Sequence, residues 1–95
     1  GIAVTRLSRT VTIVNQKGLH ARASAKFVTF VNRLPEGIKV EVEKDGQSVT
    51  GTSIMGLMML GAAQGSEVII HVEGEQAELA IEKLIGLVVD GFGED

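Results

Sequence analysis

The sequence predicts an α+β fold of two layers, in which helices cover one face of an antiparallel sheet. Segments that alternate between apolar and polar residues predict strands with one buried face, and segments with apolar residues every three or four positions predict amphipathic helices. These segments follow one another in the order β-α-β-β-α-β-α along 95 residues. Because that length suits one core, we expect residues 1–95 to form a single domain.

The first strand and the first helix are separated by a short turn. Residues 1–8 are expected to form a loose lead-in, and the alternating segment 9–15 predicts the first strand. A turn over 16–18 ends this strand with a glycine. Apolar residues at helical spacing then predict a helix over 21–32, which the proline and glycine of 34–37 end.

A hairpin and a short helix are predicted in the middle of the chain. Residues 38–43 alternate between apolar and charged side chains. The Asp-Gly pair at 45–46 favours the positive φ angles of a tight turn, which leads into a short strand over 48–50. Glycines on both sides then delimit a helix over 54–60.

The last strand and the last helix complete the predicted order. Residues 67–72 alternate, and Gly74 introduces a helix with an apolar stripe. The residues of that stripe are expected to be buried: Ala77, Ala80, Ile81, Leu84 and Val88. The opposite face of the sheet would turn polar residues to water: Lys39, Glu41, Glu43, Glu67 and His71.

The composition argues against several classes of protein. The chain has no cysteine, and its two histidines have no matching ligand set, so we expect no metal and no cofactor. A net charge of −3 and only three aromatic residues argue against nucleic-acid binding. No apolar run approaches the roughly 20 residues of a membrane span, and the start of the sequence does not resemble a signal peptide. We therefore expect a cytoplasmic protein with small-molecule or protein partners.

The motif Gly18-Leu19-His20-Ala21-Arg22 places a histidine where the first predicted helix begins. The unpaired backbone N–H groups of Ala21 and Arg22 and the helix dipole favour an anion, and the Arg22 side chain suits phosphate oxygens. The positive helix end also disfavours a protonated ring, which keeps an imidazole lone pair available. The motif predicts that His20 carries a phosphoryl group, while a solvated helix cap is the simpler alternative.

Structural roles explain the other candidate residues. His71 is expected to be a surface histidine, and Ser53 to cap the second helix, alone or with Thr52. A phosphate on Ser53 would be tolerated at that helix end and would add about −1.5 to −2 charges. We expect Glu94 and Asp95 to be solvated.

The short helix predicted over 54–60 gathers all three methionines of the chain. A helix of this length cannot bury all of its large apolar residues on one face, so some of them should be exposed. Methionine-rich surfaces adapt to several partners, and we therefore expect a contact patch here.

Residues 18–22, together with residues 53–58 (Ser-Ile-Met-Gly-Leu-Met), resemble HPr, the histidine-containing phosphocarrier family of the bacterial phosphoenolpyruvate-dependent phosphotransferase system. The resemblance covers about residues 9–92. It implies an open-faced β-sandwich, with a four-stranded antiparallel sheet covered on one face by three helices. It also implies a carrier that has no catalytic turnover of its own.

The resemblance implies roles for individual residues. His20 matches the histidine that is phosphorylated on Nδ1, and Arg22 matches the arginine that assists there. Enzyme I would supply the phosphoryl group, and A-domains of sugar permeases or regulatory proteins would accept it. Ser53 matches the serine that HPr kinase/phosphorylase modifies. The monomeric carrier would dock its partners through Phe27, Ile54, Met55 and Met58.

The sequence also departs from the family pattern. Ala23 stands where the family usually carries a proline, which leaves the start of the helix freer, and the connection over 34–37 looks slightly longer. The ending 91–95 resembles NPr, the paralogue of the nitrogen-related branch. The sequence therefore does not decide whether the protein serves sugar import, a regulatory relay or both. Two rivals are an interaction module without phosphotransfer and a small hydrolase that uses Ser53 and His20, for which no orienting acid is evident.

Overall fold

Four antiparallel strands form one sheet in the computed structural model, which describes residues 5–94. The strands are β1 (Arg6–Thr12), β2 (Lys39–Lys44), β3 (Gln47–Thr50) and β4 (Glu67–Glu73). Their order across the sheet is β1-β4-β2-β3, so that β4 pairs with both β1 and β2. The predicted antiparallel sheet is confirmed.

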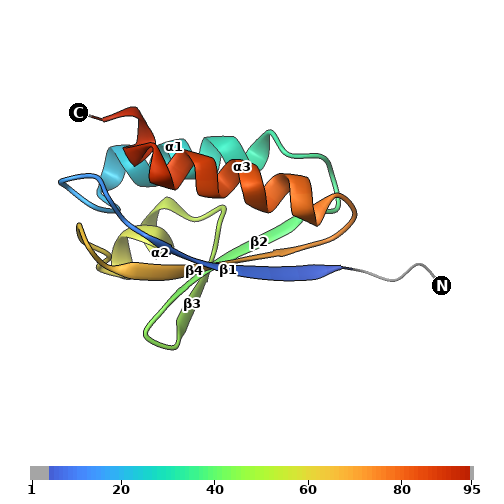
Figure 1. The fold of residues 1–95 in the computed structure, drawn as a ribbon, viewed down its shortest axis with the longest axis horizontal. Helices are drawn as coiled ribbons and strands as arrows, with labels where there is room; N and C mark the ends of the chain where they lie inside the picture. The colour runs from blue at the N-terminus through green and yellow to red at the C-terminus, as the bar shows by residue number, and fades with distance from the viewer. Residues whose placement is uncertain (1–4, 95) are drawn as a thin grey trace.

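Three helices cover one face of this sheet (Figure 1). They are α1 (Ala21–Asn32), α2 (Ile54–Met59) and α3 (Ala77–Val89), and a short 3-10 turn, η1 (Gly91–Gly93), follows them. α3 packs on β1 and β4, whereas α1 contacts α2, α3 and η1. The order of elements is the predicted one, and so are the bounds of α1. Within residues 5–94, no helix has the length and apolar character needed to cross a membrane.

The first strand begins earlier than expected. We predicted a loose lead-in over residues 1–8, but β1 starts at Arg6, and Arg6, Leu7 and Ser8 pair with residues of β4. The half-buried Leu7 packs against the core, which explains why the strand extends towards Arg6. Residues 1–4 of the expected lead-in lie outside the described part of the chain.

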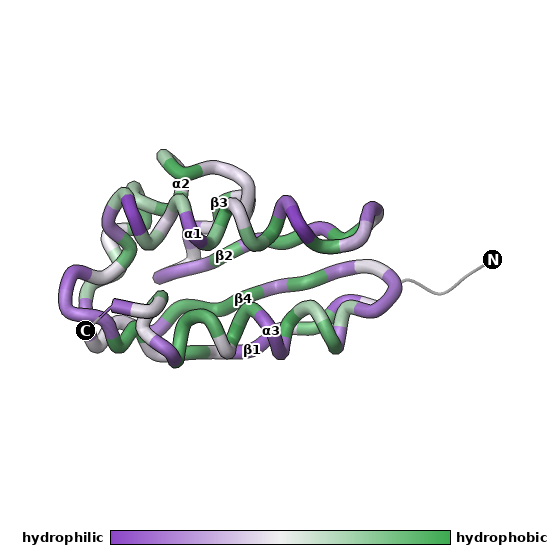
Figure 2. The backbone as a smooth tube through the Cα atoms, turned by 90° about the horizontal axis from the view of Figure 1, so that it is seen from above, coloured by the Kyte–Doolittle hydropathy of each residue, from purple (hydrophilic) through white to green (hydrophobic). Residues whose placement is uncertain are grey.

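The core lies between the sheet and the helices. Val68, Ile70 and Val72 of β4 point into it and are at most 2% exposed. All five residues of the apolar stripe predicted for α3 are buried. Figure 2 shows the same pattern along α3, in which hydrophobic stretches recur between hydrophilic ones. The stripe therefore fixes α3 on the sheet and determines where the chain enters η1.

The sheet face away from the helices carries a hydrogen-bonded histidine. His71 lies on this face, as predicted, but its side chain is only 12% exposed. Its Nδ1 lies 2.6 Å from Ser8 Oγ, and its Nε2 lies 2.9 Å from Glu43 Oε1. The predicted face of the sheet is therefore confirmed for His71, and there it links β1 to β2 because side chains on neighbouring strands meet across a sheet.

Candidate functional site

The segment between β1 and α1 is held in place by backbone hydrogen bonds. Ile13 N–H donates to Ser66 O at 2.8 Å, which extends the pairing beyond the end of β1. Leu19 N–H donates to Ala62 O at 2.9 Å, and the Leu19 side chain is buried. These contacts fix the direction in which the chain enters α1, and with it the position of His20.

Gly18 is the residue that lets this segment approach the loop at Ala62. Its φ angle is +63°, a conformation that residues with a Cβ rarely adopt. A Cβ at this position would lie 2.2 Å from Ala62 O and 2.7 Å from Ala63 Cα. The glycine of the motif is therefore required by both backbone conformation and space.

His20 occupies the N-cap position of α1 without using its side chain as a cap. Its backbone is extended, with φ −75° and ψ −179°, and its side chain makes no capping hydrogen bond. Its carbonyl accepts the N–H of Ser24 at 2.9 Å, whereas the first N–H groups of α1, those of Ala21 and Arg22, have no acceptor within the helix. The helix end therefore presents free donors beside an imidazole that is available for chemistry.

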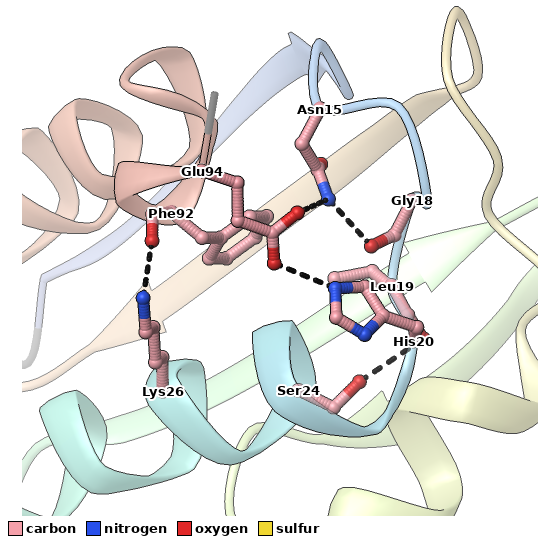
Figure 3. Close-up of polar contacts among 8 residues, drawn as sticks. All are labelled: Asn15, Gly18, Leu19, His20, Ser24, Lys26, Phe92 and Glu94. Atoms are coloured by element: carbon pink, nitrogen blue, oxygen red, sulfur yellow. Dashed lines mark hydrogen bonds and ion pairs between the residues drawn. The ribbon is translucent and has the colours of Figure 1, made fainter.

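Glu94 lies against this imidazole, contrary to our expectation of a solvated residue. His20 Nε2 and Glu94 Oε2 are 2.6 Å apart, and Asn15 Nδ2 donates to Glu94 Oε1 at 3.1 Å (Figure 3). The Glu94 side chain is 17% exposed. The hydrogen bonds from His20 and Asn15 lower the pKa of the Glu94 carboxyl from its ordinary value of 4.5. Asp95, which we also expected to be solvated, lies outside the described residues.

The turn η1 brings Glu94 to His20. Gly91, Phe92 and Gly93 have φ angles of 63°, 57° and 73°, so that three successive residues turn the chain in the left-handed conformation. The Phe92 side chain is 1% exposed, and its carbonyl accepts a hydrogen bond from Lys26 Nζ at 2.7 Å. The sequence signal for this turn is an apolar residue between two glycines, which we did not interpret as a turn.

Arg22 lies at the edge of the same site. It is exposed, and within residues 5–94 it takes part in no ion pair. With His20, Glu94, Gln16 and Lys17 it lines a hollow of about 170 Å³. Two cationic side chains and a helix N-terminus around this hollow make it suited to an anion such as a phosphoryl group.

Ser53 has the capping role that was predicted for it. It is the N-cap of α2, and its Oγ accepts the N–H of Gly56 at 2.9 Å. The Oγ atom thus satisfies one of the free donors at the start of α2. His20 and Ser53 each have other partners, so the structure does not show the Ser53–His20 pair that the rival hydrolase would need.

The methionine-rich helix α2 exposes most of its large side chains. The side chain of Leu57 is fully buried, while Met55 is 71% and Met59 is 72% exposed. Ile54 and Met58, which we expected to dock partners, are 40% and 42% exposed. The exposure that we predicted for part of this helix is confirmed.

Phe27 does not belong to that exposed surface. It is 2% exposed and packs in the core of the protein. Its place on α1, four residues after the buried Ala23 and four before the buried Val31, puts it on the helix face turned towards the sheet. The expectation that Phe27 contacts partners was therefore wrong.

Comparison with known proteins identifies the family. The family described as "PTS HPr component phosphorylation site" matches residues 7–90, and this segment contains His20 and Ser53. The chain belongs to the HPr family. It is thus a phosphocarrier of the phosphotransferase system and not an enzyme.

Individual relatives of the HPr family match nearly the whole chain. The phosphocarrier protein HPr of Pseudomonas aeruginosa is 45% identical over 85 residues, which cover 88% of this chain and 92% of that protein. The HPr of Pseudomonas putida is 44% identical over 87 residues, which cover 92% of this chain and 96% of that protein. A crystal structure of HPr-C-His from Thermoanaerobacter tengcongensis superposes with a TM-score of 0.86 at 40% identity, covering 94% of this chain and 98% of the other. The open-faced HPr fold expected from the sequence is confirmed.

Proposed function

We propose that His20 is the residue that carries the phosphoryl group in this HPr-family protein, with Arg22 assisting. The observation that supports this best is the N-cap geometry of His20. Its backbone begins α1, yet its imidazole makes no cap and borders an open hollow that Arg22 also lines. Such a ring can meet a donor protein without a change in the fold.

The charge of a phosphoryl group suits the groups that surround His20. The first backbone N–H groups of α1, at Ala21 and Arg22, have no helical acceptor and can donate to phosphate oxygens. The guanidinium of Arg22 adds donors in a planar arrangement that fits two such oxygens. Because these groups are already in place, the phosphoryl group is stabilised with little reorganisation.

The partners follow from the family and from the exposed helix α2. We propose that enzyme I phosphorylates His20 and that A-domains of sugar permeases or regulatory proteins accept the group. Ile54, Met55 and Met58 would contact both kinds of partner, and the exposed Met59 extends this surface. A monomeric carrier in the cytoplasm remains our expectation, as does single-domain organisation.

Ser53 is proposed as a site of regulation by phosphorylation. Its hydroxyl caps α2, so a phosphate there would remain next to the N-terminus of that helix. The same phosphate would place about −1.5 to −2 charges beside the apolar side chains of Ile54 and Met55. Partners that bury these side chains would then dock more weakly.

Reconstituted phosphoryl transfer tests the proposal. The wild-type protein, His20→Ala and His71→Gln are incubated with phosphoenolpyruvate and enzyme I, and acid-labile phosphate is mapped to residues. Phosphate is expected on His20 in the wild type and in His71→Gln, and none in His20→Ala. Transfer to His20→Ala, or an unlabelled wild type, would contradict the proposal. Acceptor domains from the sugar and nitrogen-related branches then show which branch takes the phosphoryl group.

A further inference from the structure

The contact between Glu94 and His20 supports an inference that rests on the proposed role of His20 as phosphoryl acceptor. We propose that Glu94 is a positioning residue for phosphoryl transfer. Its carboxylate holds the Nε2–H of His20, so that the Nδ1 lone pair faces the incoming phosphorus, and it stabilises the charge that the ring acquires.

The carboxylate is fixed on both of its oxygens before any transfer takes place. Glu94 Oε2 lies 2.6 Å from His20 Nε2, and Oε1 accepts Asn15 Nδ2 at 3.1 Å. Asn15 is 5% exposed and its Nδ2 also donates to Gly18 O at 2.8 Å, which anchors it to the turn before α1. A carboxylate held from two sides in this way can orient the ring that it contacts.

The hydrogen bond selects the nitrogen of His20 that reacts. A neutral imidazole has one nitrogen that donates and one that offers a lone pair, and an ionised carboxylate only accepts. The contact with Glu94 therefore places the proton on Nε2 and leaves the lone pair on Nδ1. In Figure 3, the second ring nitrogen of His20, Nδ1, points away from Glu94 and towards the start of α1. The backbone N–H groups of Ala21 and Arg22, which have no acceptor within the helix, belong to this first turn.

The same contact stabilises the ring as the phosphoryl group arrives. The Nδ1 lone pair forms a bond to phosphorus, and the bond from phosphorus to the donor breaks with its electrons staying on the donor. The ring thereby gains a positive charge, shared with Nε2–H, which lies against the carboxylate of Glu94. This resembles the way in which an aspartate stabilises an imidazolium in a catalytic triad. When an acceptor takes the phosphoryl group, the N–P electrons return to the ring.

The cations around the hollow keep the carboxylate from repelling the phosphoryl group. Arg22 and Lys17 line the hollow beside His20, and Lys26 lies near enough to Glu94 to stabilise its negative charge. Glu94 contacts the ring at Nε2, whereas the phosphoryl group would bind at Nδ1. The carboxylate and the phosphoryl group therefore act on opposite sides of one ring.

Two variants of Glu94 test the inference. In Glu94→Gln, a neutral amide replaces the charge at nearly the same shape; in Glu94→Asp, the charge stays but the side chain is one methylene shorter. We expect both to slow single-turnover transfer from phosphorylated enzyme I, Glu94→Gln by about five- to tenfold because a hydrogen bond to a charged group is stronger than a neutral one. Affinity for enzyme I should stay unchanged. Nitrogen-15 NMR of the imidazole should show Nε2–H in the wild type and a mixture of tautomers in Glu94→Gln.

The controls separate this inference from the proposed function. Glu82→Gln removes a charge from an exposed position of α3 and should transfer at the wild-type rate. A wild type that takes no phosphate on His20 overturns the proposed function itself. A normally labelled wild type with an equally fast Glu94→Gln, or with unchanged tautomers, overturns only the role of Glu94. An equally fast Glu94→Asp would show that charge without positioning is enough, which also overturns it.

Discussion

Lys26 Nζ lies 2.7 Å from the carbonyl oxygen of Phe92, and this hydrogen bond joins α1 to the turn η1 across 66 positions of the sequence. The Phe92 side chain is buried, and Glu94 follows two residues later beside His20. The position of the Glu94 carboxylate therefore depends on how firmly η1 is held against α1.

Lys26→Met should weaken this connection. The variant keeps most of the apolar stem but removes the only donor at the end of the side chain. We expect a loss of about 1 kcal/mol in the free energy of unfolding, measured with urea, because one hydrogen bond to the backbone is lost. The imidazole nitrogen-15 spectrum should also move towards that of Glu94→Gln. An unchanged spectrum would show that η1 holds Glu94 without Lys26.

Arg22 should affect transfer and not stability. Its side chain is exposed, so Arg22→Ala should change the free energy of unfolding by no more than about 0.5 kcal/mol. Single-turnover transfer from enzyme I should slow by roughly tenfold, which corresponds to about 1.4 kcal/mol of lost stabilisation of the transferring group. Arg22→Lys keeps the positive charge without the planar donors, so its transfer rate should lie between those of Arg22→Ala and the wild type. Full recovery would show that charge alone is required.

Two substitutions at Ser53 separate its capping role from its proposed regulatory role. Ser53→Ala removes the acceptor for the N–H of Gly56 and should destabilise the protein by about 1 kcal/mol. Ser53→Asp keeps a capping oxygen, so its stability should stay near that of the wild type. Its added charge beside Ile54 should nevertheless weaken binding to enzyme I in calorimetry. Unchanged binding would argue against regulation through docking.

Gly18 should tolerate no side chain. In Gly18→Ala, the Cβ would lie 2.2 Å from Ala62 O at a φ angle of +63°, so the backbone bond that positions Leu19 cannot persist. We expect Gly18→Ala to lower the free energy of unfolding by roughly 3 kcal/mol or more. Gly46→Ala is the matched control, since its φ is +80° but nothing lies within 4 Å of the added Cβ. Gly46→Ala should lower the free energy of unfolding only by the conformational strain, about 1–2 kcal/mol.

The pairing of Glu94 predicts a dependence of stability on pH. Its pKa is lowered in the folded protein, chiefly by the hydrogen bond from His20 and then by that from Asn15. A lowered pKa adds stability above the ordinary value of 4.5, and this stability is lost as the pH falls through the lowered value. The Nε2–H of His20 and the ammonium group of Lys26 are the groups near the carboxylate that favour its ionised form.

Urea unfolding of the wild type and Glu94→Gln over a series of pH values measures this dependence. The wild type should be more stable than the variant at neutral pH, and the difference should shrink as the pH falls below about 4.5. A difference that does not change with pH would show that the carboxylate is not ionised in the pair.

Much of the fold could be predicted because its signals are local. The alternation in β4 and the apolar stripe of α3 each follow from neighbouring residues, and the capping role of Ser53 follows from its place before α2. Where the structure differs from the prediction or adds to it, distant residues decided the outcome. Leu7 continues β1 because β4 offers it a partner, and His71 is half-buried because Ser8 and Glu43 reach it from neighbouring strands.

The residues expected to dock partners also show that local patterns do not decide which side chains are exposed. Helical spacing indicated an apolar face on α1, but the exposed and buried sides of a helix are distinguished only by what packs against it. Phe27 packs in the core and is 2% exposed, whereas Met55 on α2 is 71% exposed.

The sequence alone determined the antiparallel sheet with its helices, the place of His20 at the start of α1 and the family resemblance, because periodicity, turn residues and short motifs act over a few neighbouring positions. The tertiary structure alone decided that Glu94 completes the site. Its carboxylate meets a ring 74 positions away, and that contact depends on the packing of α3 and on the left-handed turn of η1. The glycines around Phe92 are a local signal for the turn, but local residues do not indicate which distant side chain Glu94 meets.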